Sequence, residues 1–218
     1  MTQMTRNDRF RNKSAKEAFT EIYNINDWGN RESVSGSGST KVNASLITER
    51  LPQAFESLKI KRLYDAACGD FNWMKDVVKH LEYYRGADIV DMLIQDNISK
   101  YETDKIKFKV CNMVIDNIEN ENFDAILLRD VLVHFPTVHV IDVLNKLKKC
   151  GIKYLIATDF SKIAQNIDIE SFGLWRPINL EIEPFNLGEP IYRIREENQK
   201  YMWHSIWKED KELNIWKL

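Results

Sequence analysis

The chain has 218 residues, 44% of them hydrophobic and 29% charged, and its formal net charge is −2. This balance is typical of one soluble globular domain and excludes a disordered or fibrous chain. The near-neutral charge gives no global reason to expect nucleic acid as a partner, although a local basic groove stays open.

The sequence has no pattern for a membrane segment, a secretion signal or a metal site. No apolar run approaches the roughly 20 residues that cross a bilayer, and residues 6–13 are too charged for the core of a signal peptide. The three cysteines are widely spaced and form no CxxC pair, which is typical of a reducing compartment. His134 and His139 are also too far apart for one helical metal face. We therefore expect a cytoplasmic protein without a bound metal.

The first predicted elements are two helices on either side of a small polar run. Residues 14–23 have a helical pattern with Ser14 as a candidate cap. Apolar residues at near-helical intervals predict a second helix over residues 42–57. Residues 33–40, rich in serine and glycine, lie between the two helices. We expect this serine–glycine run at the N-terminus of the second helix.

Beyond residue 60, short apolar runs alternate with amphipathic segments. Strands are predicted over 62–66, 83–87, 106–111, 123–128 and 153–158, and helices over 72–81, 91–101 and 137–149. This alternation favours an α/β fold with a mostly parallel sheet and helices on both faces.

The C-terminal part of the chain has a different pattern. Residues 175–180 form a proline-containing loop, and strands over 190–195 and 200–207 predict an antiparallel hairpin at the sheet edge. We expect one compact domain, in which a helical segment of residues 1–58 covers a site carried by residues 59–218.

The loop after the first predicted strand is the first place to look for a ligand, because parallel sheets bind ligands beyond the carboxyl ends of their strands. It contains Cys68, Gly69 and Asp70. Gly69 permits a close approach of backbone to ligand, and a helix from about Asn72 directs its first amides into the site. A single glycine argues against the dinucleotide fingerprint, which has three. The alternative is a tight turn without a ligand.

Asp88 follows the second predicted strand, at a suitable distance after the glycine loop. An acidic residue about 20 residues after that loop can accept hydrogen bonds from both hydroxyls of a ribose. The alternative is a helix N-cap, which aspartate also favours. The combination with Gly69 favours the ribose role.

At these residues the chain resembles the class I methyltransferases that depend on S-adenosylmethionine (SAM). The segment 65–69 is similar to their first motif, Asp88 to their ribose-binding residue, 110–113 to the loop beside adenine, and 124–130 to their fourth strand and active-site loop. The resemblance covers roughly residues 60–208. It implies a Rossmann-like fold with a seven-stranded sheet, SAM as cofactor and S-adenosylhomocysteine as product. It also implies a set of cofactor-binding residues: Asp65, Ala67, Cys68, Gly69, Trp73, Asp88, Ile89, Asn112, Met113 and Arg129.

A narrower resemblance is to a small bacterial subfamily often found in capsule or other surface-polysaccharide loci. It rests on five segments, 28–29, 32–39, 68–74, 129–134 and 175–180. This resemblance implies O-methylation of a sugar or of a phosphoramidate or phosphate-bearing group, on a small or glycan-linked acceptor.

The serine–glycine run has two interpretations. Ser35, Gly36 and Ser37, with the nearby Trp28, are candidates to bind an anion through backbone amides, either the SAM carboxylate or the substrate. The alternative is a flexible linker.

Two residues after the fourth predicted strand are candidates for catalysis. Methyl transfer needs an oriented acceptor and a group that removes its proton. His134 has a side chain suited to that task near neutral pH, and Asp130 can orient the imidazole, bind the SAM ammonium or be the base itself. The alternative for His134 is a partly buried histidine bonded to backbone. Arg176 and Asn179 are candidates to hold an anionic substrate, as is Arg129.

Other functional classes stay open. A catalytically silent SAM-binding or scaffold protein has the same motifs, and a methyltransferase for nucleic acid or another small molecule is a further alternative. We expect no nucleic-acid partner, because the Asn-Pro-Pro-Tyr type of motif is absent after the fourth strand. A helix N-terminus beside Cys68 is able to lower the pKa of its thiol, but the sequence offers this thiol no base, so we interpret it as a packing residue.

Overall fold

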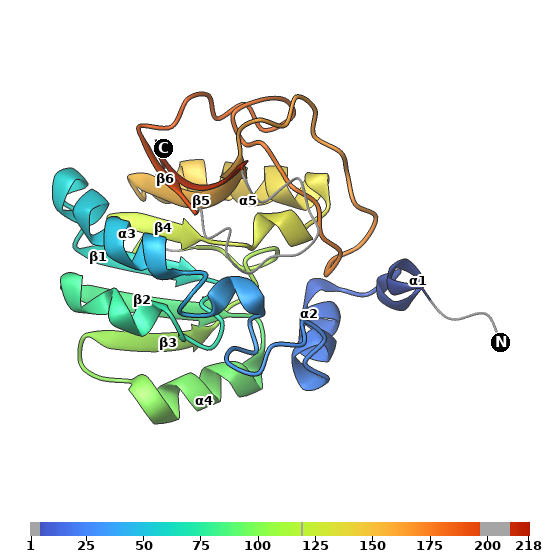
Figure 1. Ribbon diagram of the computed structural model, residues 1–218, viewed down its shortest axis with the longest axis horizontal. Coiled ribbons are helices and arrows are strands. Elements are labelled where there is room, and N and C mark those ends of the chain that lie inside the picture. The colour runs from blue at the N-terminus through green and yellow to red at the C-terminus, as the bar shows by residue number, and fades with distance from the viewer. Residues whose placement is uncertain (1–4, 119, 197–209) are drawn as a thin grey trace.

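The computed structural model describes residues 5–118, 120–196 and 210–218. Its centre is a seven-stranded sheet in the order β3-β2-β1-β4-β5-β7-β6 (Figure 1). The strands are β1 (Arg62–Ala66), β2 (Tyr83–Asp88), β3 (Ile106–Val110), β4 (Ala125–Leu128), β5 (Tyr154–Phe160), β6 (Tyr192–Arg195) and β7 (Lys211–Lys217). Strands β1 to β5 are parallel to one another, and β7 is antiparallel to both β5 and β6. The predicted mostly parallel sheet with an antiparallel C-terminal edge is therefore confirmed.

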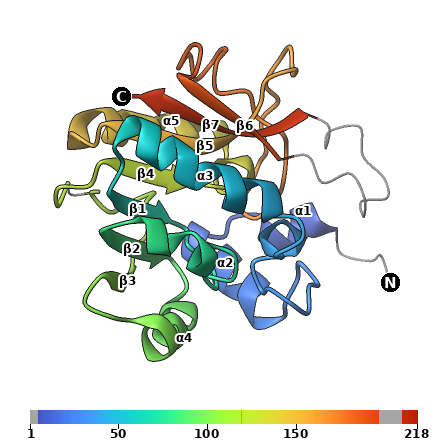
Figure 2. The same cartoon turned by 60° about the vertical axis from the view of Figure 1, so that its left-hand side comes forward.

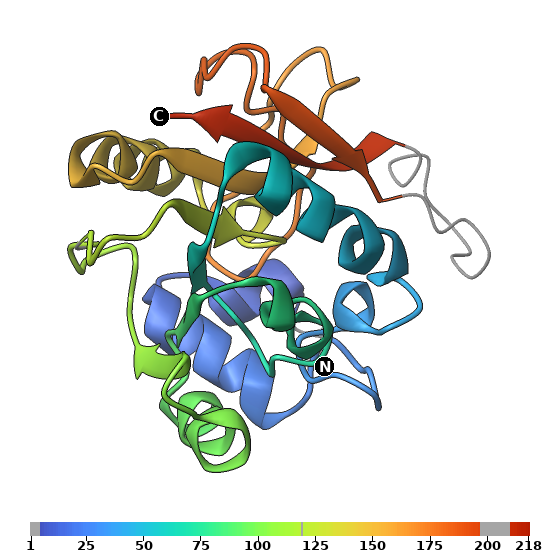
Figure 3. The ribbon, with the colours of Figure 1, turned by 90° about the vertical axis from the view of Figure 1, so that its left-hand side faces the viewer.

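Apolar side chains cover both faces of the sheet, as a buried parallel sheet requires. Ile126 and Leu128 of β4 pack in one core cluster with α5 (Thr137–Cys150), while Ala125 and Leu127 pack in the other with α3 (Ser45–Leu58). Figure 2 shows α3 in front of the sheet and α5 behind it. The same arrangement is seen from a third side in Figure 3. The two-residue period of the strand thus distributes its side chains between two helical layers.

Several predicted boundaries are close to the observed ones. Helix α2 (Ala15–Asn24) begins after Ser14, whose side chain forms a capping box with Glu17. Helix α4 (Asp91–Tyr101) is observed where it was predicted. A short helix, α1 (Arg6–Phe10), precedes α2. The predicted strand over 200–207 lies outside the described residues, and the strand that pairs with β6 is β7, further along the chain.

The predicted helix over 72–81 is wrong. Two 3₁₀ turns, η2 (Met74–Asp76) and η3 (Val78–His80), occupy this segment, and their hydrogen bonds run from residue i+3 to residue i. Trp73, Met74 and Val77 are buried here, so tertiary packing determines the path of the backbone. Residues 72–81 therefore provide no α-helix N-terminus, and the dipole contribution predicted from this segment is absent.

The serine–glycine run also differs from the prediction. It contains a 3₁₀ turn, η1 (Ser37–Ser39), whereas α3 begins only at Ser45 and has no side-chain cap. The run is therefore not at the N-terminus of that helix. None of the helices in the described part of the chain is long and apolar enough to cross a membrane.

Candidate functional site

A cavity lies at the carboxyl ends of β1, β2, β3 and β4, where the strand order reverses between β1 and β4. All the cofactor-binding residues predicted from the sequence line it, from Asp65 to Arg129. Trp28, Ser35, Asp130 and His134 line it as well. Residues far apart in the sequence, each chosen for a local pattern, are thus brought together around one space.

Asp88 is held at the rim of this cavity by backbone. Its Oδ2 accepts a hydrogen bond from the Gly69 amide at 3.1 Å, and its Oδ1 accepts one from the Val90 amide at 3.1 Å. Burial raises the pKa of Asp88, and these two amides oppose that rise. The carboxylate is therefore oriented before any ligand arrives, with further lone pairs able to accept hydrogen bonds.

Asp65, at the end of β1, is a second buried carboxylate of the cavity, only 4% exposed. Burial raises its pKa to about 7, against the effect of the hydrogen bond that Tyr84 donates to its Oδ2 at 2.7 Å. A carboxylate with so raised a pKa is stabilised by any nearby cation or hydrogen-bond donor. Asp65 thus favours a positively charged or donating ligand group.

Asp70 anchors the serine–glycine run to the glycine loop, a role that the sequence pattern did not indicate. Its carboxylate accepts from the Ser33 hydroxyl at 2.9 Å and from the Val34 amide at 3.0 Å. The Ser35 hydroxyl accepts from the Asp70 amide at 3.1 Å. A side chain at Gly69, whose φ is +56°, would meet Ser35 Oγ at 2.1 Å. This contact and the positive φ therefore exclude a side chain at position 69.

The loop after β3 supplies Cys111, Asn112 and Met113 to the cavity. The Asn112 side-chain oxygen already accepts from the Val114 amide at 3.1 Å. This bond fixes the direction of the side-chain amide, and a carbonyl oxygen retains a second lone pair. Asn112 is thus an ordered polar group in a wall that is otherwise largely apolar.

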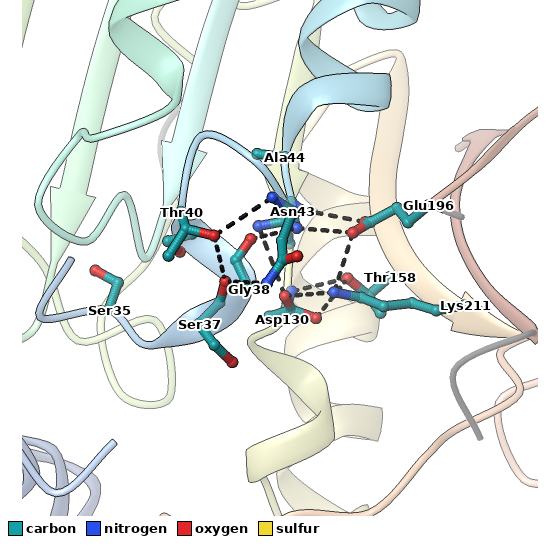
Figure 4. A network of polar contacts seen from close by, with 12 residues as sticks. Ser35, Ser37, Gly38, Thr40, Asn43, Ala44, Asp130, Thr158, Glu196 and Lys211 are labelled. Carbon is teal, nitrogen blue, oxygen red and sulfur yellow. Dashed lines mark hydrogen bonds and ion pairs between the residues drawn. The ribbon is translucent and has the colours of Figure 1, made fainter. Parts of the chain in front are cut away.

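Arg129 and Asp130 follow β4 and belong to a buried ionic network (Figure 4). Arg129 forms two hydrogen bonds with Glu196, at 3.1 and 2.7 Å, and donates to the Gly38 carbonyl at 2.9 Å. Lys211 contacts Glu196 at 3.0 Å and Asp130 at 2.6 Å. The network joins the serine–glycine run, the end of β4 and the C-terminal hairpin. Its two positive and two negative charges balance one another.

Asp130 is an ionised member of this network. Burial alone would raise its pKa, but Lys211 and Arg129 outweigh burial and hold the pKa of this carboxyl well below its usual range. Its backbone is in the left-handed region, with φ at 56°, and its amide donates to Thr158 Oγ1 at 2.8 Å. A carboxylate stabilised in this way is a weak proton acceptor, which disfavours Asp130 as the base.

His134 lies in the 3₁₀ turn η4 (Leu132–His134) beside aromatic side chains of the cavity. Its ring centroid is 5.5 Å from that of Trp28 and 6.3 Å from that of Phe19. Its Nδ1 is 2.7 Å from the Leu174 carbonyl oxygen. A carbonyl only accepts, so Nδ1 carries the proton and Nε2 carries the lone pair of the neutral ring. Burial lowers the pKa of His134, which keeps this ring neutral.

Cys68 and Trp73 complete the wall near Arg129. Burial raises the pKa of the Cys68 thiol well above its ordinary value, so the thiol stays protonated. The pKa of this thiol is thus raised rather than lowered, and its role as a packing residue stays a prediction. The Arg129 guanidinium lies 5.2 Å from the Trp73 ring centroid, a cation–π distance.

Four predicted substrate-binding residues lie outside the cavity lining: Gly36, Ser37, Arg176 and Asn179. Arg176 donates to the carbonyls of Ile167 and Leu132 at 3.0 Å each, and Asn179 donates to those of Ser161 and Ile163. The Nε and Nη1 of Arg176 and the Nδ2 of Asn179 are thus engaged with backbone carbonyls. The role of these four residues in holding a substrate stays a prediction.

Conversely, α2 contributes two aromatic residues that the sequence pattern did not assign to a site. Phe19 and Tyr23 line the cavity, whereas Ala15, Ala18 and Ile22 are buried in the core. The spacing of four between the aromatic residues places them on one helical face. That spacing was the only sequence signal for a role of these two residues in the site, but an aromatic pair on a helix more commonly packs in a core.

The cavity fits SAM in charge and in polarity. Three carboxylates line it: Asp130 is paired with Lys211, whereas Asp65 and Asp88 have no ion-pair partner among the described residues, and Arg129 is already paired with Glu196. SAM carries a sulfonium and an ammonium group against one carboxylate, so the two unpaired acidic groups favour it. Its ribose and adenine have polar partners available in Asp88 and Asn112, and apolar walls in Ile89 and Met113.

Comparison with solved structures identifies the fold. The N-methyltransferase NodS from Bradyrhizobium japonicum WM9, in complex with S-adenosylhomocysteine, has a TM-score of 0.63 at 11% identity, over 90% of this chain and 97% of that one. Magnesium protoporphyrin IX methyltransferase from Synechocystis PCC 6803, with bound S-adenosylhomocysteine, has a TM-score of 0.52 at 15% identity, over 68% and 72%. No protein-family model and no curated protein matches the sequence. The chain has the class I methyltransferase fold, as its sequence predicted.

Proposed function

We propose that the protein is a SAM-dependent methyltransferase that methylates an oxygen of a small or glycan-linked acceptor. One observation carries the proposal: a single cavity gathers the Asp88 carboxylate, Asn112 and a histidine with a free ring nitrogen. Its position at the strand reversal of a methyltransferase fold supports the same conclusion. Division of the chain at residue 58, with the N-terminal segment covering the site, is part of the proposal.

In this proposal each residue has a defined task. Asp88 accepts the ribose hydroxyls, Asn112 accepts from the adenine amino group, and Asp65 faces the positive charge of the cofactor. SAM supplies a methyl group on a sulfonium leaving group. His134 Nε2 takes the proton from the acceptor hydroxyl as its oxygen is methylated, and the Leu174 carbonyl stabilises the imidazolium through Nδ1. Asp130, ionised and close to this turn, favours the protonated ring electrostatically.

The acceptor is proposed from sequence resemblance. A sugar hydroxyl or a phosphoramidate or phosphate-bearing group of a surface polysaccharide is the candidate, and the acceptor is a small molecule rather than nucleic acid. The aromatic side chains of Phe19, Trp28 and Phe135 near His134 favour a ring-shaped acceptor, because sugar and aromatic rings pack well against such walls.

The test is release of S-adenosylhomocysteine from SAM in the presence of sugar, phosphoramidate and phosphate-bearing acceptors. We expect turnover that depends on one acceptor class, and His134→Ala to lower it by roughly two to four decades without changing SAM affinity. Tight SAM binding without turnover on any acceptor would instead establish the silent SAM-binding alternative. Normal turnover in His134→Ala would transfer the role of base to solvent or to another group.

A further inference from the structure

Residues 172–176 brace the turn that carries His134. The Gly173 amide donates to the His134 carbonyl at 3.2 Å, and the Arg176 amide donates to the Val133 carbonyl at 3.1 Å. The Arg176 side chain adds a third bond, from Nη1 to the Leu132 carbonyl at 3.0 Å. One short segment therefore binds all three successive carbonyls of η4.

The same segment contacts the imidazole itself. Leu174, between the two bracing residues, provides the carbonyl that accepts from His134 Nδ1 at 2.7 Å. The brace therefore determines which ring nitrogen carries the proton, because the protonated nitrogen must face this carbonyl. A displacement of the turn relative to this segment would break the bond and allow the other tautomer.

Arg176 is an unusual residue to bury for packing alone. It is only 5% exposed, and its Nη2 has no hydrogen-bond partner among the described residues. Burial lowers the pKa of the guanidinium to about 10, so its environment opposes the charge. Its fork reaches the Ile167 carbonyl through Nε and the Leu132 carbonyl through Nη1. Only arginine among the basic residues bonds two carbonyls in such a fixed geometry.

We propose that Arg176 is a positioning residue: it locks the Leu132–His134 turn onto residues 172–176 and so holds the imidazole with its Nε2 lone pair free. The proposal rests on the proposed function, in which His134 is the base. It replaces the role of anion binding that the sequence suggested for Arg176. The charged groups that face the imidazole are Asp130, which favours the protonated ring, and Arg6 and Arg176, which oppose it.

Nuclear magnetic resonance of the full chain with ¹⁵N-labelled histidine tests the proposal without any acceptor. The His134 signals are assigned by their loss in His134→Gln. We expect the wild-type ring to be protonated at Nδ1 and to titrate below an ordinary histidine. In Arg176→Met the tautomers should mix, because the turn loosens and the bond to the Leu174 carbonyl no longer fixes the proton on Nδ1. Arg176→Lys keeps the charge without the fork, so its tautomers should mix as well.

Arg50→Met is the matched control, because Arg50 is exposed on α3, which packs on the other face of the sheet. A wild-type tautomer in Arg176→Met would overturn the proposal. If Arg176→Met does not fold, a wild-type tautomer in Arg176→Lys overturns it. With an acceptor in hand, Arg176→Met should lower kcat by about 100-fold at unchanged SAM affinity. Normal turnover in His134→Ala together with a changed tautomer in Arg176→Met would refute His134 as the base, but not the positioning role of Arg176.

Discussion

Replacement of Asp88 by alanine separates the proposed cofactor site from a cavity that only resembles one. In the proposed complex the Asp88 carboxylate accepts two ribose hydroxyls while the amides of Gly69 and Val90 keep it in place. Alanine removes the acceptor and leaves the rest of the cavity wall intact.

The expected loss follows from the bonds removed. A hydrogen bond to a charged group contributes about 1.5–3 kcal/mol, so two contribute about 3–6 kcal/mol. Since about 1.4 kcal/mol is a factor of ten, the Kd for SAM should rise by about 100- to 10,000-fold. Alanine also leaves two amides without a partner, at about 1–3 kcal/mol each, so the free energy of unfolding should fall. Asp88→Asn keeps the shape, loses the charge and should give an intermediate Kd.

Isothermal titration calorimetry with SAM and with S-adenosylhomocysteine measures these affinities. Near-UV circular dichroism establishes that each variant is folded, so that a weaker Kd is not mistaken for unfolding. A folded Asp88→Ala protein with the wild-type Kd would refute the assignment of Asp88 to the ribose. Equal losses in the alanine and asparagine variants would show that charge, rather than the number of acceptors, dominates.

Two further predictions concern stability, and both are measured by urea unfolding. Glu196→Gln should lower the free energy of unfolding by about 3–5 kcal/mol, because it leaves Arg129 buried without its main partner. The double variant Arg129→Met, Glu196→Met should recover most of the lost stability. A loss below about 1 kcal/mol in Glu196→Gln would contradict a buried network. Asp65 has a pKa of about 7 in the folded state against an ordinary value of 3.8, so the folded state binds the extra proton and stability should fall as pH rises between these values. The full loss of stability is on the order of 4 kcal/mol, and Asp65→Asn should abolish it. Burial also raises the pKa of Asp159 to about 7, so Asp159 adds a separate pH-dependent loss, which Asp159→Asn should remove.

The sheet was predictable because its strands carry their own signal. Every residue of β4 and β5 is buried, so each strand appears in the sequence as a short, mainly apolar run, independent of the strand it pairs with. The segment 72–81 has a pattern that predicts a helix, yet it forms 3₁₀ turns, because Phe71 takes a positive φ and the side chains of Trp73 and Met74 pack into the core. Local periodicity does not contain that tertiary requirement.

The cavity-lining residues that directly follow a strand were predictable from the sequence, whereas contacts between segments distant in the sequence were not. Gly69, Asp88 and Asn112 occupy positions fixed by strand ends, so strand spacing and the family resemblance placed them in the cavity wall. The Asp70 contact with the serine–glycine run and the Arg129–Glu196 pair join segments 35 or more residues apart, and no sequence period links them. The contacts of Arg176 were unpredictable for the same reason, since a buried arginine bonded to carbonyls has the same local pattern as one that binds an anion.

The distant contacts bear on how the site works. The serine–glycine run is bonded to the glycine loop through Asp70 and to the hairpin through Gly38, Arg129 and Glu196, and its Ser35 lines the cavity. If the proposed function holds, cofactor and acceptor meet beside this segment, which is held from both sides. The charges of the network then do more than stabilise the fold, because they pair Arg129 and Lys211 with carboxylates. In the described cavity wall, orientation of the acceptor then depends on the aromatic side chains and His134 rather than on a free cation.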